Sequence, residues 1–187
     1  MSFTRSIYLL LLVIVAWCGY YLFAPSTNDA TQIASDTEQP IFSGHKLENI
    51  TYGKDGLRSY SIQAEKLDHY SASGETIFAQ PTLMVYREGS TLEWKMSAVK
   101  AVLDQQKVLT LYDDVLMQNL LPDASFKTLS TDKVVINLTS RDFKADQKVK
   151  LLGPKFETTG GAMHGNLKAN TATLTDEVQG RYEIVTP

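Results

Sequence analysis

The sequence has almost no cysteine, because Cys18 is the only one among its 187 residues. A disulfide within the chain and a cysteine-based metal site are therefore excluded. Histidine is also scarce, and His45, His69 and His164 do not have the spacing of metal ligands. A folded domain must then rely on apolar packing and backbone hydrogen bonds, and we expect no bound metal.

Strong charge and catalytic motifs are missing as well. The formal net charge of −3 disfavours a general nucleic-acid binder. The sequence contains no P-loop, no G-x-S-x-G elbow and no H-E-x-x-H motif. Its carboxylates are scattered, with no evident acid–base pair. We therefore expect no enzyme, no catalytic residues and no cofactor, so energy for any transport must come from a partner.

One long apolar run is present, at residues 7–24, and it contains no charge. As a helix rising about 1.5 Å per residue it spans about 27 Å, close to the bilayer core of about 30 Å. Arg5 precedes the run and Asp29 follows it, which favours a cytoplasmic N-terminus. The run therefore predicts a transmembrane anchor at 7–24 behind a cytoplasmic segment at 1–6.

A cleaved signal peptide is the alternative interpretation of this run. Cleavage after Ala24 would place the bulky Leu22 in the recognition site and Pro25 directly after the cut, and both disfavour cleavage. Residues 25–40 are polar with a proline at each end, which predicts a linker. Residues 41–187 then form the folded domain.

Apolar and polar residues alternate through this domain. Tyr60, Ile62 and Ala64 share one side of an extended segment, and similar alternation appears within 92–98, 109–117 and 134–138. A period of two predicts strands with one buried face. Glycine-containing turn signals separate these segments. Many short antiparallel strands predict an all-β sandwich, roll or barrel.

A series of short motifs runs through this domain. They are Leu57-x-x-Tyr60, Phe78-Ala79-Gln80-Pro81, Trp94-x-x-x-Ala98, Leu109-x-Leu111-Tyr112, Leu121-Pro122-Asp123, Thr131-Asp132, Ile136-Asn137-Leu138, Leu151-Leu152-Gly153 and Gly165-Asn166-Leu167. Each motif alone is weak, but in their order and spacing they resemble the LptC family of lipopolysaccharide export system proteins.

The resemblance implies a twisted β-jellyroll in the periplasm, held to the inner membrane by a single-pass helix. It also implies that the jellyroll accepts lipopolysaccharide from an ATP-driven inner-membrane transporter of the LptB, LptF and LptG type. The lipid would then pass to a soluble LptA-type periplasmic carrier, through a bridge of paired edge strands to the outer membrane. A structural scaffold of the cell envelope that transports nothing is the alternative.

Acyl chains need an apolar path, because exposing each methylene to water costs about 0.8 kcal/mol. With the resemblance, a trough between two sheets is the expected lipid-binding site, and a closed core is the alternative. The candidate lipid-contact residues are Ile62, Phe78, Leu83, Trp94, Leu109, Leu111, Met117, Ile136, Leu138, Leu151 and Phe156.

Unpaired strand edges are the expected docking surfaces, because they present free backbone groups to another chain. We expect an N-terminal edge to face the transporter and a C-terminal edge, within Ala169 to Tyr182, to face the carrier. Gly153 precedes Pro154 and is expected at a bend or a close backbone approach. The expected partner-contact residues are Leu47, Ile50 and Tyr52 at the first edge and Ala172 and Tyr182 at the second.

Overall fold

The structure is a computed structural model that describes residues 13, 17, 39–124 and 126–182. The predicted anchor at 7–24, apart from Val13 and Trp17, and the predicted linker up to residue 38 lie outside the described residues. Within the described part of the chain, no helix is long and apolar enough to cross a membrane.

Fourteen strands, all paired antiparallel, make up the described part of the compact unit Glu38–Pro187, which confirms the predicted all-β fold. They are β1 (Phe42–Tyr52), β2 (Arg58–His69), β3 (Thr76–Ala79), β4 (Thr82–Arg87), β5 (Thr91–Ser97), β6 (Lys100–Leu103), β7 (Val108–Asn119), β8 (Thr128–Asn137), β9 (Asp142–Ala145), β10 (Val149–Leu152), β11 (Phe156–Gly160), β12 (Ala162–Asn166), β13 (Thr171–Thr175) and β14 (Gln179–Tyr182).

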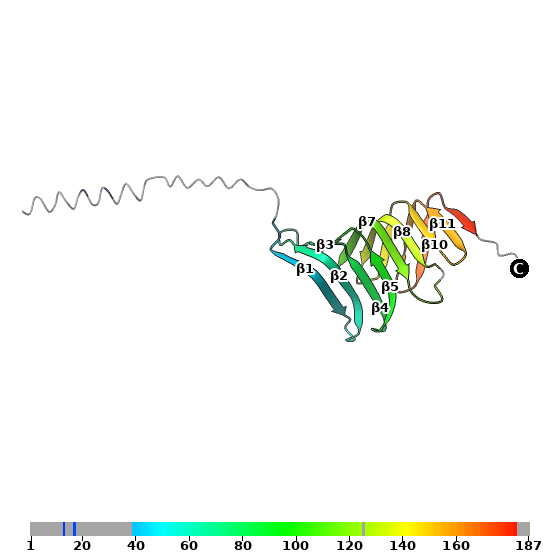
Figure 1. The fold of residues 1–187 in the computed structure, drawn as a ribbon, viewed down its shortest axis with the longest axis horizontal. Coiled ribbons are helices and arrows are strands. Elements are labelled where there is room, and N and C mark those ends of the chain that lie inside the picture. Colours follow the sequence, from blue (N-terminus) through cyan, green and yellow to red (C-terminus); the bar gives the residue numbers. More distant parts are fainter. Residues whose placement is uncertain (1–12, 14–16, 18–38, 125, 183–187) are drawn as a thin grey trace, which may run out of the picture. The chain divides into compact units, whose positions relative to one another are not determined.

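Two layers arise because the long strands change partners halfway along. The first half of β7 pairs with β6 and its second half with β5, while β8 pairs with β9 at one end and with β10 at the other. β2 divides in the same way between β3 and β4. We call the layer containing β3, β6, β9, β12 and β13 sheet I, and the layer containing β4, β5, β10, β11 and β14 sheet II (Figure 1).

A crease separates the sheets wherever the chain crosses from one to the other. Left-handed backbone conformations occur there at Lys46 in β1, at Gln80 between β3 and β4, and at Asp113 and Asp114 in β7. The two aspartates lie opposite the single residue Asp132 of β8 and form a bulge. A bulge bends its strand and increases the local twist, so β7 can continue from one sheet into the other.

Apolar side chains from both sheets fill the space between them. Leu109 and Leu111 come from the sheet I half of β7, while Val115 and Met117 come from its sheet II half, and all four are fully buried. Each such side chain contributes about 1.5–3 kcal/mol on burial. The predicted alternation of Tyr60, Ile62 and Ala64 toward the interior is confirmed by their burial.

Opposite the crease, the two sheets end in turns, and we call this the open side. Sheet I contributes the turns 104–107, 138–141 and 167–170, and sheet II contributes 53–57 and 88–90. Along the other direction of the sandwich the strands progress from β1 at one end to β11 and β14 at the opposite end (Figure 1).

Candidate functional site

The predicted lipid-contact residues come together between the two sheets. Nine of the eleven are buried with at most 4% of their surface exposed, and Leu151 and Phe156 pack against the same core while remaining partly exposed. Sheet I supplies Phe78, Leu109, Leu111, Ile136 and Leu138, and sheet II supplies Ile62, Leu83, Trp94, Met117, Leu151 and Phe156. The interior is closed at the nine buried residues.

Polar side chains join the sheets across the open side. Arg141, in the turn after β8, donates from Nη2 to the Ser59 carbonyl oxygen at 3.1 Å and to the Ser59 hydroxyl at 2.9 Å. Ser59 lies in the sheet II half of β2, so this contact bridges the layers. Burial lowers the pKa of the Arg141 guanidinium, since desolvation disfavours its charged form.

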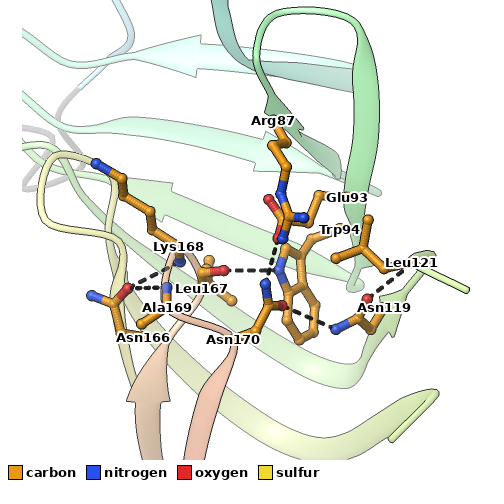
Figure 2. A network of polar contacts seen from close by, with 10 residues as sticks. All are labelled: Arg87, Glu93, Trp94, Asn119, Leu121, Asn166, Leu167, Lys168, Ala169 and Asn170. Carbon is orange, nitrogen blue, oxygen red and sulfur yellow. Dashed lines mark hydrogen bonds and ion pairs between the residues drawn. The ribbon is translucent and has the colours of Figure 1, made fainter. Parts of the chain in front are cut away.

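A second bridge uses Trp94 of β5. Its indole Nε1 donates to the Leu167 carbonyl oxygen at 3.2 Å, as Figure 2 shows. The Asn166 side-chain oxygen accepts hydrogen bonds from the backbone N–H groups of Lys168 and Ala169, at 3.0 and 2.9 Å. An Asn side chain bonded to the backbone two residues on forms an Asx turn, and here it fixes the turn that presents the Leu167 carbonyl.

Asn170 completes the contacts across the open side. Its Nδ2 donates to Glu93 Oε1 at 2.7 Å, and its Oδ1 accepts from Asn119 Nδ2 at 3.2 Å (Figure 2). Glu93 is only 4% exposed and also pairs with Arg87 at 2.6 Å, which satisfies its buried carboxylate. We call the contacts of Arg141, Trp94 and Asn170 the cross-sheet latch.

A cavity of 660 Å³ lies on the open side, between turns of both sheets. Its walls come from the turn 53–57, the turn at 87–89, Lys107, the turn 138–141 and Lys168. Leu138, one of the predicted lipid-contact residues, reaches this cavity, which we call the mouth. At the mouth, the buried core residues Tyr60 and Leu138 form part of the cavity wall.

The predicted partner-contact residues lie on strands that have a single strand partner each among the described residues. β1 pairs only with β2, β13 only with β12 and β14 only with β11. Ile50, Tyr52, Ala172 and Tyr182 are exposed, and Leu47 is partly buried. Free backbone edges therefore occur at both ends of the sandwich.

The C-terminal segment differs in one respect from the single C-terminal edge that we expected. It forms two strands on different sheets, β13 in sheet I and β14 in sheet II. Asp176 and Glu177 between them have left-handed backbone angles, with φ of 61° and 51°. Ala172 and Tyr182 thus belong to two separate edges, one for each sheet.

Gly153 begins the turn between β10 and β11, and its N–H donates to the Phe156 carbonyl oxygen at 2.9 Å. A Cβ at this position would overlap the ring of Phe156. That ring lies 6.1 Å from the ring of Tyr182, and the two residues are cross-strand partners in β11 and β14. Gly153 therefore makes room for an aromatic pair that supports the sheet II edge.

Gly153→Ala is expected to lower the free energy of unfolding by about 1–3 kcal/mol, because the added methyl group must push the Phe156 ring aside. Urea denaturation measures this. Gly180→Ala is the matched control, since a Cβ there meets nothing closer than 3.3 Å. Phe156→Leu should relieve part of the cost of Gly153→Ala in a double-mutant cycle. Equal stability of both alanine variants, with no coupling to Phe156, contradicts the close approach.

Several residues of the latch and the mouth were not among the sequence predictions. Arg141 contacts a residue 82 positions away, and Asn170 contacts residues 51 and 77 positions away. No local pattern marks such pairs. The one available signal was Asn166 in a polar turn, which is typical of an Asx turn.

Comparison with known structures defines the class of fold. The domain resembles the crystal structure of LptH from Pseudomonas aeruginosa, described as the LptA-homologous periplasmic component of the lipopolysaccharide transport device. The TM-score is 0.53 at 11% identity, covering 68% of this chain and 95% of that one. The fold is therefore an LptA-like β-jellyroll.

Sequence comparison then identifies the family. Residues 8–183 match the family described as lipopolysaccharide-assembly, LptC-related. The chain is 28% identical to the lipopolysaccharide export system protein LptC of Haemophilus influenzae, over 93% of each chain. It is 30% identical to the LptC of Escherichia coli K12, over 84% of this chain and 82% of that protein. The chain belongs to the LptC family.

Proposed function

We propose that this protein carries lipopolysaccharide from the inner membrane toward the outer membrane, with the acyl chains passing between the two sheets. One observation carries the proposal: the apolar interior extends between a free strand edge at β1 and free edges at β13 and β14. A lipid held there can reach a neighbouring jellyroll without crossing water. The family and the LptA-like fold support the same conclusion.

The proposed topology is a single-pass protein of the cell inner membrane. Residues 1–6 lie in the cytoplasm, 7–24 form the anchor, 25–40 form the linker and 41–187 form the periplasmic domain. The uncharged run at 7–24 and the polar segment after it support this arrangement.

The proposed partners are different at the two ends. An inner-membrane ATP-driven transporter of the LptB, LptF and LptG type docks at the β1 edge and supplies the energy. An LptA-type carrier docks at the β13 and β14 edges by strand addition. No catalysis, cofactor or nucleic acid takes part. Among the described residues, no group of His, Cys, Asp and Glu side chains could hold a metal ion.

A structural scaffold is the second candidate, and the closed interior favours it. A photoreactive residue at Phe78 separates the two functions. We expect a lipopolysaccharide adduct there when the transporter hydrolyses ATP, because Phe78 is 4% exposed and faces the interior. Lys95 is the control, since it is exposed in β5 between the buried Trp94 and Met96. Adducts at neither residue would favour the scaffold, and adducts at Lys95 alone would mean that the lipid path runs along the outer face.

A further inference from the structure

Basic side chains concentrate around the mouth, although the whole chain has a net charge of −3. The mouth has fewer acidic than basic side chains, and the acidic ones are Asp55, Glu88 and Glu93. Both sheets contribute cations, so the positive charge surrounds the cavity. The basic lining residues are Lys54, Arg58, Arg87, Lys107, Arg141 and Lys168.

The three acidic groups of the mouth offset half of the formal charge of its six basic groups, which leaves a net positive charge. Glu93 Oε1 already accepts from Arg87 at 2.6 Å and from Asn170 at 2.7 Å. Asp55 Oδ1 accepts the Leu57 backbone N–H at 3.0 Å. Within the described part of the chain, Arg87 is the only basic residue of the mouth in an ion pair.

Two arginines are therefore available to an anion. Arg141 is half-buried, and its guanidinium donates hydrogen bonds only to the neutral Ser59. Glu93 offsets only part of the desolvation of this charge, because burial still lowers the pKa of the guanidinium. Arg58 lies over the ring of Tyr86, with Cζ 4.8 Å from the ring centroid. A side-chain hydrogen bond with Tyr86 raises the pKa of Arg58, so the same tyrosine holds the guanidinium in place. A guanidinium has five N–H donors, so further donors remain for an anion.

Part of the inner wall of the mouth is apolar, beside the buried Glu93. Tyr60 and Leu138 line it with 9% and 4% of their surface exposed, and both belong to the core between the sheets. A cationic rim over an apolar interior matches an amphiphile whose acyl chains carry an anionic headgroup. Guanidinium groups bind phosphate through paired hydrogen bonds, which lysine cannot reproduce.

We infer that the mouth is a phosphate-binding site for the phosphorylated sugar headgroup of the transported glycolipid, with Arg58 and Arg141 as its principal ligands. The inference rests on the proposed function, since it names the part of the lipid that this site recognises. The acyl chains enter between the sheets beneath the headgroup, and the phosphates stay at the rim.

The test measures binding of lipid A by the full chain in detergent, with bisphosphorylated and enzymatically dephosphorylated lipid A as probes. Arg58→Gln and Arg141→Gln should each weaken binding of the phosphorylated probe about tenfold, through loss of charge-assisted hydrogen bonds. Arg58→Gln should not change binding of the dephosphorylated probe, because Arg58 does not hold the two sheets together. Arg141→Lys should recover part of the lost affinity. Arg181 is an exposed cation of β14, at the opposite end of the sandwich from β1, so Arg181→Gln should have no effect.

The outcomes separate the site from the proposed function. If the wild-type protein binds both probes equally and Arg58→Gln changes neither, the site is wrong while lipid binding stands. If the wild-type protein binds neither probe, both are wrong.

Inorganic phosphate and the deacylated phosphorylated disaccharide test the source of the phosphate. Tight binding of inorganic phosphate, with no preference for the lipid, would overturn the headgroup assignment. Arg58 lies outside the latch, so a folding defect of Arg141→Gln leaves the Arg58 result decisive.

Discussion

Deleting residues 171–187 is expected to abolish binding of the LptA-type carrier while binding of the inner-membrane transporter is kept. The deletion removes β13 and β14, the two strands whose outer edges are free at this end of the sandwich. Backbone hydrogen bonds supply much of the affinity in strand addition. We expect a loss of about a hundredfold or more in Kd, measured by pull-down or surface plasmon resonance.

The truncated protein should remain folded, because the deleted strands contribute little to the core. All of β14 is exposed, and in β13 only Leu174 packs against the core, partly buried. Asn170 is retained, so the cross-sheet latch stays intact. A chain ending at Thr175 keeps β13 and tests the contribution of β14 alone. A truncated protein that keeps the carrier and loses the transporter would show that the two ends are reversed.

Joining the two sheets covalently across the open side is expected to stop lipopolysaccharide uptake almost completely. The interior is closed at nine of the predicted lipid-contact residues, so the sheets must separate before acyl chains reach them. Asn119 in sheet II and Asn170 in sheet I make side-chain contact at 3.2 Å, which makes them suitable for a short bifunctional thiol reagent. The variant Asn119→Cys with Asn170→Cys should carry Cys18→Ser, which removes the only native thiol.

Reduction of a cleavable bridge should restore uptake in the same sample, which separates the bridge from the substitutions. Lys150 and Glu157 provide the matched control pair. They contact each other at 2.8 Å, but both lie in sheet II, on β10 and β11. Bridging Lys150→Cys with Glu157→Cys should leave uptake unchanged. Normal uptake by the protein bridged between Asn119 and Asn170 would mean that the lipid path does not run between the sheets.

Local periodicity predicted the strands well but not the way they bend. Tyr60, Ile62 and Ala64 face the interior as their alternation indicates. In β8, Val134 and Ile136 are buried, but toward the other end Leu129 and Thr131 are buried instead, so the inward parity changes near Asp132. The cause lies in the crease and in the bulge of the neighbouring β7. No residue of β8 by itself signals the change.

The apolar part of the candidate site could be predicted, but its polar part could not. Buried positions follow from alternation, which is a property of each strand alone. Glu93 lies next to Trp94 in β5 and should point outward by the same alternation, yet it is buried. Its partner Asn170 comes from a turn 77 residues later. Such pairs depend on how the two sheets approach each other, and that geometry is set by the complete topology.

Trp94 gives the domain a spectroscopic reporter at the latch. It is one of two tryptophans in the chain, and the other, Trp17, lies in the N-terminal apolar run. The Trp94 indole is held by the Leu167 carbonyl oxygen and lies 5.7 Å from the ring of Phe126, measured between ring centroids. Separation of the sheets exposes the indole either to water, which shifts its fluorescence to longer wavelength, or to hydrocarbon, which does not. The emission of unlabelled protein therefore distinguishes a sandwich that opens empty from one that opens around a lipid.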